Sequence, residues 1–285
     1  METKNIFADP SQEIVKVSPT KLTSKLIYSL LGIRLMYGLM AAIALRWLPG
    51  VLVVVSILYI FFTYLVTSWL IWRERNNLSD YHIGKLALIL FIASAPYQAI
   101  LAIFKLMPLA IPPVLIILPV FVLLFVALIK SKPVNLINPK GLLQWVLLGI
   151  GVGILCGIPA GWLISLQANH SSAPLSMLWV LLLPTVQISA AAVQEEPLFR
   201  GFFWGYLEKR GWTTLRILIV QALLFWIGHI YYLVSGDVYS FWVLPLASGL
   251  VFGWIAWKGK DIAPSMFAHG FFNSVSQIVA TLIGK

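Results

Sequence analysis

Two adjacent glutamates, Glu195 and Glu196, lie between long apolar runs of the sequence. They follow the apolar residues 178–193 and precede an apolar, aromatic segment, whereas the other acidic residues lie in polar segments or short connections. An ionised carboxylate in apolar surroundings costs several kcal/mol unless it is paired or lines a polar cavity. The two glutamates therefore mark a candidate functional site.

Helical spacing gives the two glutamates different expected roles. Glu196 and Arg200 are four residues apart and share one helix face, so they are expected to form an ion pair. Glu195 is rotated by about 100° from Glu196 and has no partner at helical spacing, which leaves it available for proton transfer. Pro197 follows directly and is expected to kink the helix and direct Glu195 into a cavity. An intramembrane ion-pair network without chemistry is the alternative interpretation.

Two histidines, His229 and His269, lie inside apolar runs. Each belongs to a set of residues spaced by four, which drifts by only about 40° per step on a helix and so forms one stripe. In a membrane such polar stripes face the interior of the helix bundle. A single intramembrane histidine is most simply explained by an interhelical hydrogen bond, but several polar stripes together predict a shared site. The stripes comprise Gln221, Phe225 and His229 in one run and Ser265, His269, Asn273 and Gln277 in another.

Three motifs occur in order along the chain: Glu195-Glu196-x-x-x-Arg200, Phe225-x-x-x-His229 and His269-x-x-x-Asn273. They resemble the three motifs of the CPBP intramembrane protease family, the CAAX-protease and bacteriocin-processing group that is also called Abi. The resemblance covers residues 180–280. It implies an intramembrane endopeptidase that cleaves a membrane-associated protein or peptide. The catalytic residues it implies are Glu195, His229, His269 and Asn273, with Glu196 and Arg200 in supporting roles.

Peptide hydrolysis needs an activated water, a stabilised oxyanion and a proton for the leaving amine. Glu195, helped by His229, is expected to take a proton from water, while His269 and Asn273 donate hydrogen bonds to the oxyanion. The alternative is one divalent metal, most simply zinc, bound by Glu195, His229 and His269 with water in the fourth position. The sequence has no His-Glu-x-x-His zinc motif, which favours the metal-free version.

Two further function classes stay open. A non-catalytic membrane scaffold or immunity protein could use the same fold for binding, but the intact motifs favour an enzyme. A proton-coupled transporter could use Glu195 and the histidines as a relay. Such a transporter is expected to contain related repeats in its two halves, and the sequence shows no repeat.

The composition is that of a polytopic membrane protein. Hydrophobic residues make up 60% and charged residues 11% of the 285 residues, far from the average of a soluble domain. The mean hydropathy is +0.91. The net charge of +10 does not indicate nucleic-acid binding, because the basic residues lie at the ends of apolar runs. The lipid bilayer is therefore an expected partner, and nucleic acid is not.

Nine apolar runs are each long enough to cross a bilayer, which takes about 20 helical residues. We therefore expect an all-α transmembrane helix bundle of about nine spans with an Abi/CAAX-protease-like core. The expected division is a cytoplasmic segment 1–25, a four-span unit 26–138 and a protease core 139–285. The runs are 26–47, 50–72, 86–107, 109–129, 142–167, 176–205, 214–234, 239–257 and 262–283.

Basic residues alternate between the connections. The N-terminal segment and the even-numbered connections carry most of the lysines and arginines, for example Arg73, Lys132 and Lys209, whereas the odd-numbered connections carry few. By the positive-inside rule, this pattern places the N-terminus in the cytoplasm and Lys285 on the outer side. We expect a multi-pass protein of the cell (plasma) membrane.

Two features of the other spans carry expectations about packing. The fifth span has glycines at strict four-residue spacing, and small residues on one helix face allow another backbone to approach closely. This span is expected to be a packing helix. The first four spans contain few residues suited to chemistry. Arg34 in the first span is the exception, and it is expected to snorkel from near a helix end to the membrane interface. The glycines are Gly149, Gly153, Gly157 and Gly161.

Overall fold

Side-chain caps begin several of the helices. The computed structural model describes residues 20–103, 136–166, 176–235 and 238–284. Helix α1 (Lys21–Trp47) starts after Thr20, whose hydroxyl accepts a hydrogen bond from the backbone N–H of Thr23 at 3.2 Å. Helix α5 (Pro139–Ser165) starts after Asn138 and has proline as its first residue. Helix α6 (Met177–Gln187) starts after Ser176. Such caps satisfy N–H groups that lack a partner in the first turn.

The remaining described elements are also helical. Among the described residues, seven helices are long and apolar enough to cross a membrane, and a shorter apolar helix covers Lys85–Leu101. The predicted all-α membrane bundle is confirmed, and the count of nine spans is approximate, because the predicted span 109–129 lies outside the described residues. The other long helices are α2 (Leu52–Arg73), α3 (Lys85–Ile103), α9 (Thr214–Ile227), α11 (Val238–Gly259) and α12 (Ala263–Ile283). The division of the chain at residue 138 stays a prediction.

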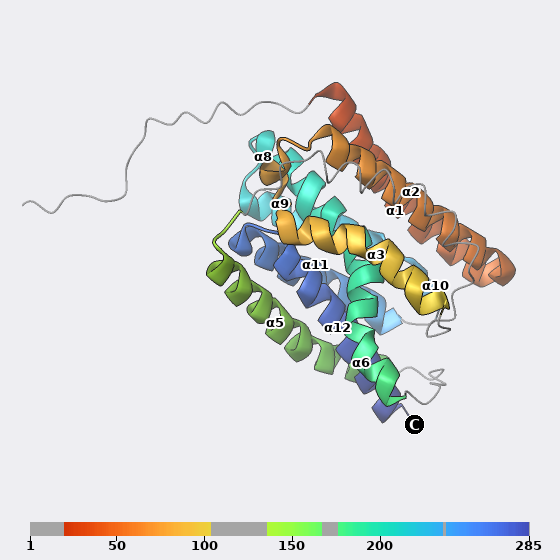
Figure 1. Ribbon diagram of the computed structural model, residues 1–285. Helices are drawn as coiled ribbons and strands as arrows, with labels where there is room; N and C mark the ends of the chain where they lie inside the picture. Colours follow the sequence, from red (N-terminus) through yellow and green to blue (C-terminus); the bar gives the residue numbers. More distant parts are fainter. Residues whose placement is uncertain (1–19, 104–135, 167–175, 236–237, 285) are drawn as a thin grey trace, which may run out of the picture.

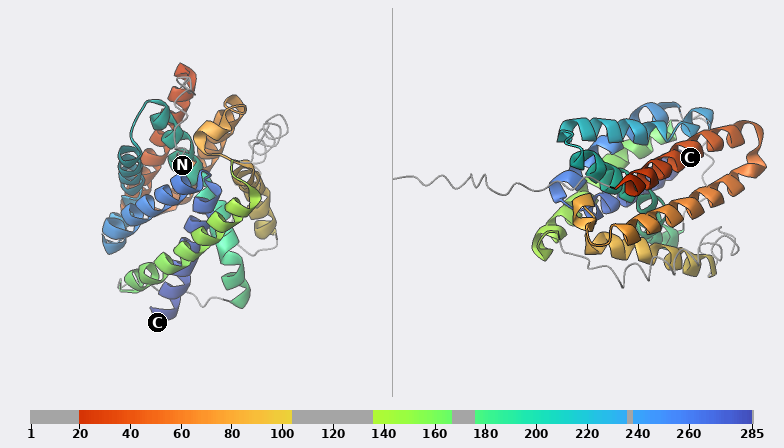
Figure 2. Two further views of the ribbon diagram at one scale, coloured as in Figure 1. Left: turned by 90° about the vertical axis from the view of Figure 1, so that its left-hand side faces the viewer. Right: turned by 90° about the horizontal axis from the view of Figure 1, so that it is seen from above.

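The long helices pack in two main groups (Figure 1). Helices α1 and α2 form a hairpin on one side of the bundle, and α5 runs along α12 on the other side (Figures 1 and 2). Between the two groups passes the segment from α6 to α8 (Phe203–Lys209), which carries the two glutamates. The other helices therefore surround the segment that carries Glu195, Glu196 and Arg200.

The glycines of α5 lie against α12. A Cβ atom on Gly153 would lie 2.5 Å from the carbonyl oxygen of Ala268, and one on Gly161 would lie 2.5 Å from that of Ser276. Real side chains do not tolerate such distances, so the two backbones approach this closely only because the glycines lack side chains. The prediction of a packing helix is confirmed, and its partner is the helix that carries His269 and Asn273.

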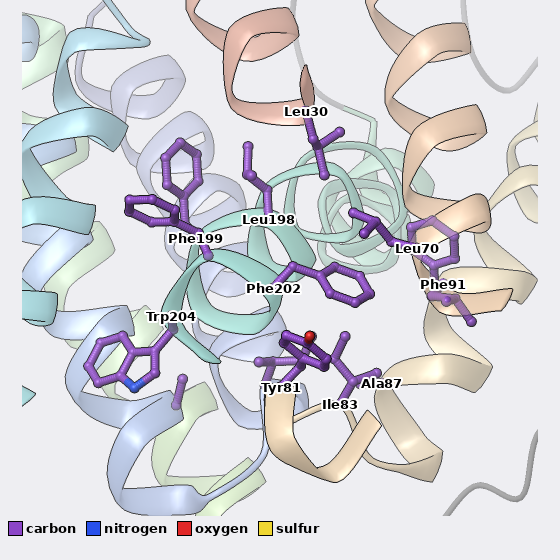
Figure 3. Packing of buried hydrophobic residues seen from close by; sticks show 14 of the residues in the cluster. Leu30, Leu70, Tyr81, Ile83, Ala87, Phe91, Leu198, Phe199, Phe202 and Trp204 are labelled. Atoms are coloured by element: carbon purple, nitrogen blue, oxygen red, sulfur yellow. The ribbon is translucent and has the colours of Figure 1, made fainter. Parts of the chain in front are cut away.

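A buried aromatic cluster anchors the central segment (Figure 3). Phe199, Phe202 and Trp204 are each at most 1% exposed. The ring of Phe202 lies 5.1 Å from that of Tyr81, and Leu30 of α1 and Leu70 of α2 belong to the same cluster. Because side chains from the first three helices pack on this segment, those helices contribute to the environment of the glutamates.

The basic connections meet at one end of the bundle. His82 Nε2 lies 3.0 Å from Glu208 Oε2, and Lys209 Nζ lies 3.0 Å from Asp80 Oδ2. The backbone N–H of Ile262 donates to the carbonyl of His82 at 2.9 Å. The second, sixth and eighth connections therefore share one side, as the charge alternation predicts. Which side of the membrane this end faces stays a prediction.

Candidate active site

The two glutamates lie in one short α-helical turn between two π-helical segments. Helix α7 (Val193–Glu196) is preceded by the π-helix η3 (Ile188–Ala192) and followed by the π-helix η4 (Pro197–Phe202). Wider π turns inside α-helices are frequent at functional sites. Proline has no N–H for the regular α-helical hydrogen bond, and the expected distortion at Pro197 takes the form of the second π segment.

Glu195 lies at the centre of three nitrogen-bearing side chains from other helices. Its Oε1 atom is 2.6 Å from Nη2 of Arg34 and 3.8 Å from Nε2 of His229. Its Oε2 atom is 3.8 Å from Nε2 of His269. The side chain of Glu195 is 10% exposed. The structure thus brings the first three predicted catalytic residues together, and it adds an arginine.

The position of Arg34 corrects two expectations. Arg34 does not snorkel to the interface, because its side chain is 2% exposed and its guanidinium group points at Glu195. Glu195 therefore has an ionic partner, whereas helical spacing gave it none. Helical spacing identifies partners only within one helix, whereas this partner comes from α1. The signal that could have found it was an arginine in the middle of an apolar span, far from both of its ends.

The tautomer of His229 follows from its hydrogen bonds. Nδ1 lies 2.7 Å from the carbonyl oxygen of Phe225, an acceptor only, so Nδ1 carries a proton. Nε2 lies 3.0 Å from Nη2 of Arg34, which can only donate, so Nε2 presents its lone pair. His229 is thus a neutral ring held between α1 and the last turn of α9.

Glu196 forms the predicted pair with Arg200 and one contact that was not predicted. Its Oε1 atom is 3.3 Å from Nη1 of Arg200, and both side chains are completely buried. The same oxygen accepts a hydrogen bond from Nδ1 of His269 at 2.9 Å. The guanidinium of Arg200 also lies over the ring of Phe225, 4.4 Å from its centroid. Glu196 therefore orients His269 so that its Nε2 faces Glu195.

A cavity of about 380 Å³ opens beside these groups. Its lining includes all four residues to which the resemblance assigns catalysis, while Glu196 and Arg200 lie behind them without exposed surface. The rest of the wall combines hydroxyl and amide groups with apolar and aromatic side chains. The lining residues most relevant to chemistry are Glu195, His229, His269, Asn273, Tyr231, Tyr232, Ser248 and Gln277.

Asn273 is held by an amide chain along the cavity wall. Its Nδ2 donates to Oε1 of Gln187 at 3.3 Å, and Nε2 of Gln187 donates to Oε1 of Gln277 at 3.4 Å. The other N–H of the Asn273 amide remains for a ligand in the cavity. Sequence reasoning missed Gln187, although a polar amide inside an apolar run was the available signal.

The side chains predicted as metal ligands do not fit a divalent ion in this arrangement. Nη2 of Arg34 approaches both Glu195 Oε1 and His229 Nε2, so a cationic donor occupies one carboxylate oxygen of Glu195 and the Nε2 lone pair of His229, and it would repel a metal ion there. In the described ranges, no group of three His, Cys, Asp or Glu side chains is arranged to hold a metal.

Comparison with protein-family models supports the motif resemblance. A model described as Type II CAAX prenyl endopeptidase Rce1-like matches residues 175–275. Comparison with curated proteins and with solved structures gives no match. The matched segment contains all three motifs and both histidines, while Arg34 lies outside it. The resemblance to the CAAX protease family that the motifs carry is thus confirmed for residues 175–275.

Proposed function

We propose that this chain is an intramembrane endopeptidase that hydrolyses a peptide bond in a membrane-associated protein or peptide, with water activated by Glu195. One observation carries the proposal. Glu195, His229, His269 and Asn273 come from distant parts of the family segment and line the same cavity.

The two oxygens of Glu195 have different surroundings, and this difference supports a role as base. Oε1 is bound by Arg34, whereas Oε2 faces His269 Nε2 across 3.8 Å. A water next to Oε2 would give its proton to Glu195 as its oxygen attacks the carbonyl carbon of the substrate. The proton would then pass to the leaving nitrogen, with His269 placed to relay it, and the C–N bond would break to give an acid and an amine.

Asn273 is placed to stabilise the oxyanion. One of its N–H groups is used by Gln187, and the second is free to donate to the negatively charged oxygen that forms on the carbonyl. Donors fixed in advance in a largely buried site stabilise such charge more than donors in water do. His269 lies one helical turn away on α12 and borders the same space.

The arrangement supports the metal-free version of the reaction. Arg34 supplies the positive charge next to Glu195 and His229 that a metal ion would otherwise supply. The proposed chemistry therefore uses only side chains and water, with no cofactor.

The family name points to prenylated CAAX peptides as the first substrates to test. We propose a multi-pass protein of the cell membrane whose N-terminus is cytoplasmic and whose residue Lys285 lies on the outer side. Reporter fusions at the two ends test this orientation, and two ends on the same side would contradict it.

The activity is tested by comparing cleaved membrane peptides in cells that express the wild type, Glu195→Gln or Glu208→Gln. Glu208 is the matched control, because it is a glutamate of the same segment whose side chain is 41% exposed. Fragments present with the wild type and Glu208→Gln but absent with Glu195→Gln support the proposal. The purified protein is then given a farnesylated CAAX peptide and its unfarnesylated counterpart. Equal peptide sets from all three strains would instead favour a non-catalytic scaffold or immunity protein.

A further inference from the structure

Arg34 contacts two residues of the proposed catalytic set with a single nitrogen. Its Nη2 atom is 2.6 Å from Glu195 Oε1 and 3.0 Å from His229 Nε2. Since Nη2 donates to both, it fixes the carboxylate and the imidazole relative to each other. The arginine comes from α1, outside the family segment.

The surroundings of Arg34 hold its guanidinium in place. The rings of Tyr37 and Tyr59 lie 5.6 and 5.7 Å from its central carbon and stack on each other at 4.1 Å. A cation close to aromatic rings is attracted by their π electrons, most strongly when it is shielded from water. The side chain therefore has little freedom to leave the site.

The backbone of α1 approaches the chain that carries His229. A Cβ atom on Gly38 would lie 2.6 Å from the carbonyl oxygen of Gly228, so only glycine allows this approach. Gly38 follows Arg34 by one helical turn, and Gly228 directly precedes His229. The contact between Gly38 and Gly228 therefore sets the distance between α1 and His229 that the Arg34 side chain spans.

We propose that Arg34 is a positioning residue for the reaction. It binds Oε1 of Glu195 and the Nε2 lone pair of His229, and it leaves Oε2 of Glu195 as the oxygen that meets water. Its role in catalysis rests on the proposed function, whereas its effect on Glu195 does not. A guanidinium presents several donors in a rigid plane and a lysine ammonium is one compact charge, so lysine replaces only part of this role.

The test uses dicyclohexylcarbodiimide, an apolar reagent that modifies protonated carboxyl groups, on the purified full-length protein. Mass spectrometry measures the modification of Glu195 in the wild type, Arg34→Met, Arg34→Lys and Arg46→Gln. Arg46 is the control, an exposed arginine in the last turn of the same helix. We expect little modification in the wild type, Arg34→Lys and Arg46→Gln, and a several-fold increase in Arg34→Met.

Glu196 serves as the internal control for folding. It is completely buried and paired with Arg200, so it stays unmodified if only the Glu195 site changes. Modification of both glutamates in Arg34→Met would show that Arg34 only holds the fold together, and this would overturn the proposal. Unchanged modification of Glu195 in Arg34→Met would overturn it as well.

The activity of the same variants gives a second measurement. Arg34→Lys should lower kcat by roughly 100-fold, as small misplacements of catalytic groups do. KM should change little, because Arg34 is not among the residues that line the cavity. A kcat equal to that of the wild type would contradict the positioning role. If the wild type cleaves no peptide, the proposed function fails, and the labelling still tests whether Arg34 controls Glu195.

Discussion

Glu195 and Glu196 are sequence neighbours, and each is paired with a buried arginine, yet they face different parts of the bundle. Glu196 is sealed together with Arg200, which lies one helical turn further along the chain. Glu195 is paired with Arg34 of a distant helix and borders the cavity. The Glu196–Arg200 pair joins residues of one helical segment and is completely buried, whereas the Glu195–Arg34 pair joins two helices and borders the cavity.

Access to the cavity, more than charge, distinguishes the two carboxylates. Both glutamates carry the same functional group, and both are close to a guanidinium and to His269. Only Glu195 lines the cavity, whereas Glu196 is completely buried. A substitution at either position should therefore affect activity and stability in different proportions.

The largest expected effect is the loss of activity in Glu195→Gln. General-base catalysis contributes roughly 100- to 10,000-fold to a rate, and the amide cannot accept the proton. Cleavage of the substrate found in cells, measured with purified protein, should fall by this factor. Glu195→Gln should also lose some stability, since the buried Arg34 keeps its charge without its partner. Normal cleavage by Glu195→Gln would show that the two roles are assigned backwards.

The second expected effect is the loss of stability in Glu196→Gln. Removing one partner of a buried ion pair costs about 3–5 kcal/mol, because the other charge is left uncompensated. Thermal unfolding in detergent should show a larger loss than for Glu195→Gln, and activity should fall because His269 keeps only a neutral amide oxygen as its acceptor. Replacing Glu196 and Arg200 together with leucine should recover part of the stability. A stable but inactive Glu196→Gln would contradict the structural role.

A smaller effect is expected at the contact that positions His269. Gly153→Ala places a methyl group against the carbonyl of Ala268 and should cost about 1–3 kcal/mol, since the helices must move apart. Gly151→Ala is the matched control, because no atom lies within 4 Å of a Cβ at Gly151. Thermal unfolding of the two variants measures the difference. Equal stabilities would mean that the close approach of α5 and α12 is not required.

Asp261 is another buried carboxylate, and backbone N–H groups hold it. It accepts a hydrogen bond from the N–H of Ala263 at 2.8 Å, and burial raises its pKa from 3.8 to about 6. A raised pKa in the folded state means that the folded protein binds the proton more tightly, so stability falls as pH rises from about 4 to 6. Asp261→Asn should remove this fall and add on the order of 1 kcal/mol at pH 7. Unfolding curves at pH 4.5 and 7 test this, and a fall that persists in the variant would refute it.

The smallest expected effect is that of chelators. Because the Arg34 guanidinium binds Glu195 Oε1 and His229 Nε2, two atoms of the predicted metal ligands, strong chelators should leave cleavage unchanged. The assay compares activity before and after chelation and after the return of single divalent ions. Loss of activity that one ion restores would support the metal-dependent mechanism instead.

Local sequence rules predicted much of the architecture. Apolar length located the spans, since a helix must cover the hydrocarbon layer, and regular spacing placed glycines on the seam between α5 and α12. The pairing of Glu196 with Arg200 follows from the same rule, because residues four apart share a helix face. Motif order was enough to indicate the family of residues 175–275.

The tertiary structure alone decided what surrounds Glu195. No spacing rule connects Arg34 of α1 with a glutamate in α7, because their contact depends on how the helices pack. The bond from His269 to Glu196 and the amide chain from Gln187 to Asn273 likewise join separate helices. The sequence determined which polar groups had to be buried, since each had to find a partner away from water. Helix packing decided which partner each one found, and it left one oxygen of Glu195 open to the cavity.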